Sequence, residues 1–242
     1  MMNKVEIVKN KNFNDILTEN DLKMDSYIVE KIKSKYPKFN FLTEESHNDK
    51  DKFLFKDYTF ILDPIDGTCN YMRNNKLTGI QFALFLNESC VLSAIYLPYQ
   101  KEFYHAVLNG GSFKNNKKIK IDSNIKNKHS IIQLSDFSKS ANIDISKQFQ
   151  IVKNLQNQFM KTRLFGAACI DFTNIASNKS QAYISYYKHI WDIAPGLLLI
   201  KETGAVYKTL ENKNYNYGDK SLVVANNTTN LKIILDEYEK IR

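Results

Sequence analysis

An apolar run that leads directly into a pair of acids constrains this chain more than any other feature. Residues 58–62, YTFIL, have the composition of a buried strand, and they are followed at once by Asp63, Pro64, Ile65, Asp66, Gly67 and Thr68. A proline after the first acid restricts the backbone there, so both carboxylates and the carbonyl of Ile65 can be directed at one point. The alternative is a tight turn whose aspartates only cap the chain.

The chemistry of these groups suits a cation and a phosphate. Hard cations such as Mg²⁺ take oxygen ligands, usually one or two carboxylates together with water and substrate phosphates. Gly67 and Thr68 place backbone N–H groups where a helical turn would start, and helix starts bind phosphate. The segment therefore predicts a site for a divalent cation and a phosphate group.

Two further acidic positions are weaker signals on their own. Glu44, in FLTEES, follows the short apolar run 39–42, and a solvated surface pair is the alternative interpretation. Asp192 follows the only tryptophan of the chain, at the start of a helix predicted over 193–203. Pro195 would lie in the first turn of that helix, where proline is tolerated. An N-cap is the structural alternative for Asp192.

The first half of the chain is predicted to contain one helix and a largely antiparallel sheet. The spacing of apolar residues indicates a helix over 22–36, with Asp21 as a candidate N-cap and Pro37 after its end. Strands are expected at 39–42, 58–62, 77–86, 90–97 and 102–108, with a hairpin turn at 87–89.

The second half changes character after the polar segment 122–129, because strands and helices alternate there, as in α/β folds. Strands are expected at 130–135, 160–165, 181–187, 205–208 and 221–226, and helices at 144–158, 168–177, 193–203 and 229–241. We therefore predict an N-terminal α+β subdomain, residues 1–125, with most of the acidic motifs, and a C-terminal α/β subdomain, residues 126–242, with Asp192.

Composition narrows the class of protein. No apolar run reaches the roughly 20 residues that cross a membrane, and the N-terminus lacks the apolar region of a secretory signal. The three scattered cysteines fit reduced thiols better than a disulfide framework, so we expect a cytoplasmic protein with no membrane contact. The net charge of +8 would suit a nucleic-acid partner, but the lysines are diffuse rather than clustered, which argues against one.

Three motifs, taken in order, resemble those of the inositol monophosphatase family: EES at 44–46, DPIDGTCNY at 63–71 and WDIAPGLLLIKETGA at 191–205. Further segments resemble the same family, namely TEND at 18–21, GGSFKNNKKI at 110–119 and RLFGAACIDFTNIA at 163–176. The resemblance covers nearly the whole chain. It implies a layered α-β-α-β-α sandwich, part α+β and part α/β, as in inositol monophosphatase and fructose bisphosphatase.

The same resemblance implies Mg²⁺ as the cofactor and assigns its ligands. Glu44, Asp63 and the carbonyl of Ile65 would hold one ion, and a second would be held by Asp63, Asp66 and Asp192.

The resemblance also implies catalytic and substrate-binding roles. Water activated by the cation would lose its proton with the help of Glu44 and Thr68, and Asp21 would orient Thr68. The N–H groups of Gly67 and Thr68 would bind the phosphate. The substrate contacts implied are Asp66, Gly67, Thr68, Ala168, Ser185 and Asp192.

Two of the departures from the family pattern bear on substrate and assembly. Ser185 stands where the family has a glutamate that hydrogen-bonds the sugar, and Tyr186, Tyr187 and Lys188 add aromatic and cationic character nearby. The family has a long helix before the T-x-x-D segment, whereas only residues 1–17 precede Thr18 here. That helix contributes to subunit contacts, so a homodimer is an assembly that the resemblance allows but that the short N-terminus weakens.

The function implied is Mg²⁺-dependent hydrolysis of a small phosphate monoester, foremost inositol monophosphate or a related polyol or sugar phosphate. Alternatives on related scaffolds are adenosine bisphosphate nucleotidase, fructose bisphosphatase and histidinol phosphatase. An alternative of another class is a basic module that binds RNA or a transcription complex, with phosphatase activity as a secondary property.

Overall fold

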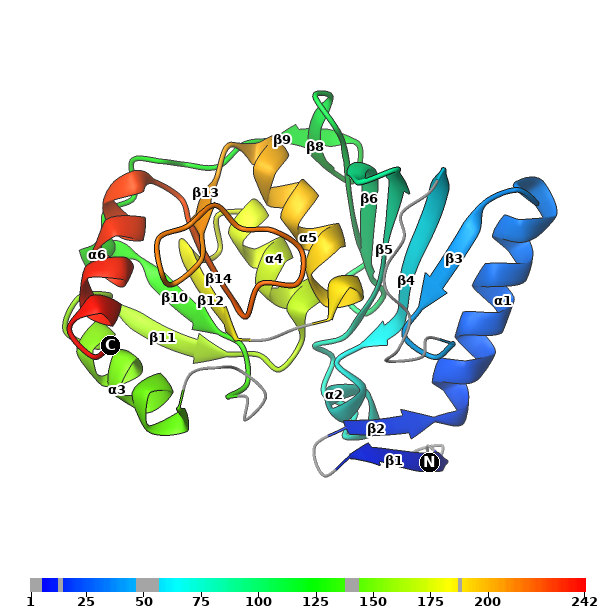
Figure 1. Ribbon diagram of the computed structural model, residues 1–242, viewed down its shortest axis with the longest axis horizontal. Coiled ribbons are helices and arrows are strands. Elements are labelled where there is room, and N and C mark those ends of the chain that lie inside the picture. The colour runs from blue at the N-terminus through cyan, green and yellow to red at the C-terminus, as the bar shows by residue number, and fades with distance from the viewer. Residues whose placement is uncertain (1–5, 13–14, 47–56, 138–143, 187–188) are drawn as a thin grey trace.

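Five alternating layers of helices and sheets make up the molecule, in a computed structural model that describes residues 6–12, 15–46, 57–137, 144–186 and 189–242 (Figure 1). In order, the layers are α1 (Glu19–Lys35), a seven-stranded sheet, α4 (Ala168–Ala176) with α5 (Ile190–Thr203), a five-stranded sheet, and α3 (Ile145–Leu155) with α6 (Thr228–Glu239). The predicted α-β-α-β-α sandwich is confirmed. None of the described helices is both long and apolar enough to span a bilayer.

The first sheet brings the acids of the N-terminal half together. Its strands are, in spatial order, β3 (Asn40–Thr43), β4 (Tyr58–Asp66), β5 (Gly79–Leu86), β6 (Ser89–Leu97), β7 (Glu102–Val107), β8 (Gly111–Lys114) and β9 (Lys117–Ile119). β3 runs parallel to β4, with Thr43 opposite Leu62, and the other neighbours are antiparallel. The carboxyl end of β3 therefore lies beside residues 62 and 63 of β4, and Glu44, which follows β3, is close to Asp63.

A second helix and an N-terminal pair of strands in the first half lie outside the predicted elements. Residues Thr68–Met72 form a short second helix, α2, directly after the acidic segment. The N-terminal segment, for which no element was predicted, forms the antiparallel pair β1 (Ile7–Asn12) and β2 (Asp15–Thr18). Both are short elements with little apolar periodicity, which is why the pattern of apolar residues did not indicate them.

The second sheet is mixed. Its spatial order is β11 (Lys161–Leu164), β10 (Ile131–Leu134), β12 (Ala182–Tyr186), β14 (Ser221–Ala225) and β13 (Val206–Lys208). β10 runs parallel to β11 and β12, whereas β14 is antiparallel to β12 and β13. The alternation of strands and helices was predicted correctly. The antiparallel pairing of β14 with β12 and β13 was not predicted. The division into subdomains at residues 125 and 126 stays a prediction.

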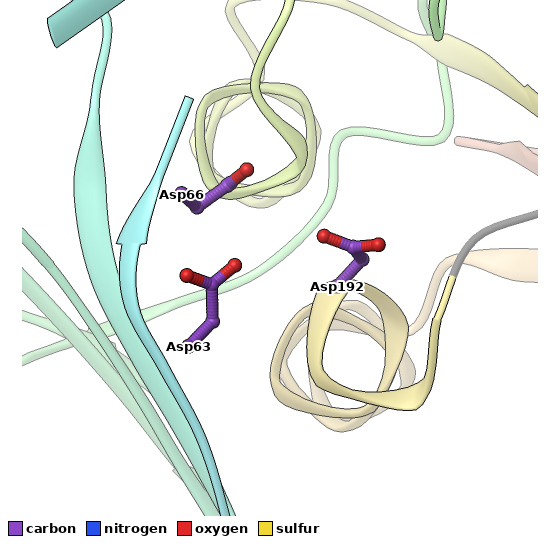
Figure 2. A group of neighbouring side chains, drawn as sticks. All are labelled: Asp63, Asp66 and Asp192. Atoms are coloured by element: carbon purple, nitrogen blue, oxygen red, sulfur yellow. The ribbon is translucent and has the colours of Figure 1, made fainter. Parts of the chain in front are cut away.

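The two helices between the sheets pack unusually closely. A Cβ at Gly196 of α5 would come within 2.0 Å of the Phe172 ring of α4, so only glycine allows this approach. The larger buried cluster surrounds these helices and includes Phe85, Phe172 and Leu198. The inner core thus fixes α4 and α5 between the two sheets, and the starts of both helices face the acidic end of β4 (Figures 1 and 2).

Candidate metal and phosphate site

Three of the predicted carboxylates converge in space. Asp63 and Asp66 end strand β4, Asp192 lies in the first turn of α5, and one oxygen from each lies within 4.8 Å of the others. Figure 2 shows the three side chains pointing toward a common point. Asp63 is 1% exposed and Asp66 is 6% exposed, so both carboxylates are buried.

The carboxylate of Asp63 is fixed by two donors. The backbone N–H of Ile65 donates to Oδ1 at 3.2 Å, and Nε2 of Gln81 donates to Oδ2 at 3.4 Å. Gln81 lies directly opposite Asp63 in the β4–β5 pairing. Each oxygen can still accept a second partner, because an ionised carboxylate offers about four lone-pair positions.

Crowded acids make the site electrostatically unusual. Burial, followed by the carboxylates of Glu44, Asp66 and Asp192, raises the pKa of Asp63 well above its ordinary value, against a smaller opposite effect of Gln81. None of these groups is a cation. Like charges in a low-dielectric environment disfavour ionisation, and a bound cation would reverse that balance. The all-oxygen donor set fits a hard divalent ion such as Mg²⁺.

Glu44 approaches this group from the neighbouring strand. Its N–H donates to the carbonyl of Leu62 at 3.0 Å, which places it beside Asp63. It is not among the three acids whose oxygens lie within 4.8 Å of one another, although its charge acts on Asp63.

Asp66 connects the two halves of the chain. Its Oδ2 accepts the backbone N–H of Cys169, in the first turn of α4. Its own carbonyl accepts the hydroxyl of Thr78 at 2.7 Å. The first N–H groups of a helix lack partners within the helix, so Asp66 caps α4 from a distant part of the sequence.

Neither Asp21 nor Asp192 is the N-cap of its helix, which was the structural alternative for both residues. α1 begins at Glu19 after Thr18, so Asp21 is its third residue, and Oδ2 of Asp21 accepts the N–H of Thr18 at 2.9 Å. α5 begins at Ile190, so Asp192 is likewise third, and its Oδ2 accepts the N–H of His189 at 3.0 Å. An acid at the third position reaches back to the cap residue.

The earlier start of α5 also moves Pro195. It is the sixth helical residue rather than part of the first turn. At this position its ring removes one intrahelical hydrogen bond, and the helix continues to Thr203.

Thr68 lies between two acceptors. Its hydroxyl is 3.1 Å from the carbonyl oxygen of Ile65 and 3.4 Å from Oδ1 of Asp21. A hydroxyl has a single proton, so Thr68 donates to one of them at a time. Asp21 is 1% exposed, and the structure thus brings together the pair that the sequence resemblance indicated.

Gly67 permits the turn that carries Thr68. Its φ is +83°, and a Cβ there would lie 2.9 Å from Cβ of Ala167. Both the conformation and the space therefore require glycine. Ala168, which is 1% exposed, is the first residue of α4 and lies next to this contact.

The predicted substrate contacts on β12 are placed less favourably. Ser185 is only 2% exposed and is the residue before the last of the strand. The side chain of Tyr186 lies on the opposite face of the sheet from Ser185, in the outer hydrophobic cluster that also contains Ile184. The prediction that Tyr186 adds aromatic character near the site is therefore wrong. Alternation along a strand accounts for this, because successive side chains face opposite ways. Tyr187 and Lys188 lie outside the described residues.

Two neighbours of the acids were not assigned roles from the sequence. The ring of His189 stacks on Trp191 with centroids 4.5 Å apart. No sequence motif pointed to Gln81, because its position opposite Asp63 depends on the register of β4 and β5.

Comparisons with known proteins find relatives in sequence and in fold. An inositol-1-monophosphatase of Bacillus subtilis is 28% identical over 229 residues, covering 94% of this chain and 84% of the relative. Nus factor SuhB of Haemophilus influenzae is 26% identical, covering 96% and 84%. A solved IMPase/NADP phosphatase in complex with Mg²⁺ and phosphate shares the fold, with a TM-score of 0.82, 22% identity and coverage of 97% and 86%.

One family model matches almost the whole length of the chain. The family pattern for inositol monophosphatases spans residues 2–242. Members of this family are phosphatases, so the chain is a phosphoric monoester hydrolase. The chain belongs to the inositol monophosphatase family.

Proposed function

We propose that the protein hydrolyses a small phosphate monoester, inositol monophosphate or a related polyol or sugar phosphate, with Mg²⁺ as the cofactor. The observation that carries this proposal is the convergence of Asp63, Asp66 and Asp192 within 4.8 Å at the buried end of β4. Three acids so close together, two of them buried, are unfavourable without a cation. The solved relative in complex with Mg²⁺ and phosphate supports the choice of ion.

The ligands that we propose are those that the sequence resemblance implies. Glu44, Asp63 and the carbonyl of Ile65 would hold one ion, and Asp63, Asp66 and Asp192 would hold a second. When bound, Mg²⁺ lowers the pKa of water and neutralises charge on the transferring phosphoryl group.

The remaining steps fall to residues of the chain. Glu44 would accept the proton of the attacking water, or Thr68 would accept it while passing its own hydroxyl proton to the carboxylate of Asp21, which holds that hydroxyl in place. The 3.4 Å approach of these two side chains supports the pairing. The N–H groups of Gly67 and Thr68 would bind the phosphate. Ala168 and Ser185 would contact the rest of the substrate.

A panel of phosphate esters, assayed with Mg²⁺ and with EDTA, tests the proposal. We expect turnover of inositol monophosphate, glycerol phosphate or a sugar phosphate in Mg²⁺ and none in EDTA. Turnover that persists without metal would refute the cofactor assignment. Preference for an adenosine bisphosphate, fructose bisphosphate or histidinol phosphate would favour one of the alternative substrates.

Ser185 leads to an expectation about selectivity. A serine hydroxyl reaches less far than a glutamate carboxylate, and a charge-assisted hydrogen bond contributes about 1.5–3 kcal/mol. We therefore expect a preference for inositol monophosphate over glycerol phosphate roughly 10- to 150-fold smaller than in a family member with glutamate there. Exclusive hydrolysis of inositol monophosphate would contradict this.

A second function is favoured by one observation, the similarity to a Nus factor. A role in binding RNA or a transcription complex would use the net charge of +8 and would weaken steeply with salt. Binding of RNA that disappears at physiological ionic strength would remove this candidate.

A further inference from the structure

A single buried glutamine interrupts the inward face of β5. The residues of this face are Gly79, Gln81, Ala83 and Phe85, all buried, and Gln81 is 0% exposed. Its Oε1 has no hydrogen-bond partner among the described residues. An unpaired buried amide oxygen is unfavourable, so an apolar residue would serve packing alone better than glutamine does.

The position of Gln81 accounts for its polar group. Residues directly opposite in an antiparallel pair have their side chains on the same face, and Gln81 is opposite Asp63. Its Nε2 donates to Oδ2 of Asp63 at 3.4 Å, while the N–H of Ile65 occupies Oδ1. The two donors act from different directions and therefore restrict rotation of the carboxylate about its last bond.

The neutrality of glutamine also matters. A lysine or arginine in its place would pair with Asp63 and compete with an incoming cation. An amide N–H stabilises the ionised carboxylate without adding positive charge, in agreement with its lowering influence on the pKa of Asp63. Groups that hold metal ligands in this way are common around metal sites.

We propose that Gln81 is a positioning residue for the cation site, which sets the orientation of the Asp63 carboxylate through Nε2. The inference rests on the proposed function of Asp63 as a metal ligand. Because a positioning residue acts before substrate binds, its loss should weaken the binding of Mg²⁺ itself.

The test is calorimetric titration of metal-free protein with Mg²⁺, in wild type and in Gln81→Met. Methionine has a similar volume but no donor. We expect about 10- to 100-fold weaker Mg²⁺ affinity, with kcat largely recovered at saturating Mg²⁺ and KM for the phosphate ester unchanged there. The melting temperature without metal should change little, since methionine also removes the unpaired oxygen.

Gln148→Met is the matched control. Gln148 is also 0% exposed, but it lies in α3, in the outer helical layer beyond the second sheet (Figure 1). We expect it to alter stability and to leave Mg²⁺ affinity unchanged. Should Gln81→Met fail to fold, Gln81→Asn carries the test, because the shorter amide cannot span the distance to Asp63 and should weaken Mg²⁺ in the same way.

The outcomes separate the two proposals. Wild type that binds Mg²⁺, with a folded Gln81 variant of equal affinity, overturns the role of Gln81 alone. Wild type that binds no Mg²⁺ overturns the metal assignment and, with it, the inference. Loss of stability in a Gln81 variant at unchanged Mg²⁺ affinity would make Gln81 a structural residue only.

Discussion

Two carboxylates of the first sheet, Asp63 and Glu102, have surroundings that shift their pKa values in opposite directions. Around Asp63 the acting groups are three carboxylates and an amide, and the pKa of Asp63 is raised, with burial as the main cause. Around Glu102 of β7, Nζ of Lys114 lies at 2.6 Å, Nζ of Lys179 at 3.3 Å, and the Tyr104 hydroxyl donates at 2.6 Å. Burial alone would raise the pKa of Glu102, but these partners hold it below its ordinary value.

The difference teaches where a cation from solvent is needed. The chain has 34 lysines and arginines, and it places two of them at Glu102. The groups that act on Asp63 include none. A protein-supplied cation makes an acid a structural element, whereas an acid surrounded by other acids gains most from an ion that binds from solution.

The largest expected effect is the loss of turnover in Asp63→Asn. An amide in place of the carboxylate that would contact both ions should lower kcat by several orders of magnitude in saturating Mg²⁺, with the fold retained. Glu102→Gln is the control, for which we expect near-normal kcat. Equal losses in the two variants would abolish the distinction between the carboxylates.

Asp21 is an intermediate case, because it accepts from two neutral groups described above, the N–H of Thr18 and the hydroxyl of Thr68. Asp21→Asn keeps an oxygen for the N–H of Thr18 but removes the charge that faces Thr68. We expect kcat to fall about 10²- to 10⁴-fold, and Thr68→Ala to do the same. The double variant should be little slower than either, since residues that act as one unit are not additive.

Melting temperatures accompany these kinetics. Asp21→Asn should unfold close to the wild-type temperature if its main role is catalytic. Full activity in this variant would return Asp21 to a capping role and leave Glu44 as the only base.

Stability without metal should fall as pH rises because of Asp63. Its folded pKa is above the unfolded one, so between the two values the folded state binds more protons, and stability declines with increasing pH. Thermal unfolding in EDTA from pH 4 upward should show this decline in wild type and not in Asp63→Asn. Stabilisation by Mg²⁺ should accordingly grow with pH, because cation and proton compete for the same oxygens.

Glu102 should show the smaller and opposite dependence. Its folded pKa is lowered, so its contribution is present above the unfolded pKa and is lost as pH falls through the folded value. Glu102→Gln should cost about 1–3 kcal/mol at neutral pH and flatten the acid side of the unfolding profile. A variant as stable as wild type at pH 7 would show that the two lysines contribute nothing measurable, as many surface pairs do.

Much of the fold could be predicted because its long elements carry clear periodicity. The strands β4 to β7 and the helices α3 to α6 lie within a few residues of their predicted ranges. The starts of α1 and α5 could not be located, since an aspartate at the third position resembles a capping residue in sequence. Thr18 and His189 occupy the true cap positions.

The acids of the candidate site were recognisable from local motifs, whereas their supports were not. Asp63 and Asp66 share one short segment with a proline and a glycine, a pattern visible in sequence. Gln81 and the N–H of Cys169 reach these acids only through strand register and the docking of α4. Such contacts depend on tertiary structure, and nothing local to either residue specifies them.

The contact between Gly196 and Phe172 has a consequence for inherited or engineered variation. α4 carries the N–H that holds Asp66, and α5 carries Asp192 one helical turn before Gly196. The distance between these two carboxylates therefore depends on the absence of a side chain at position 196. A Gly196→Ala substitution would replace none of the proposed metal ligands, but it would push the two helices apart. A change in helix packing would then appear as weaker binding of the metal.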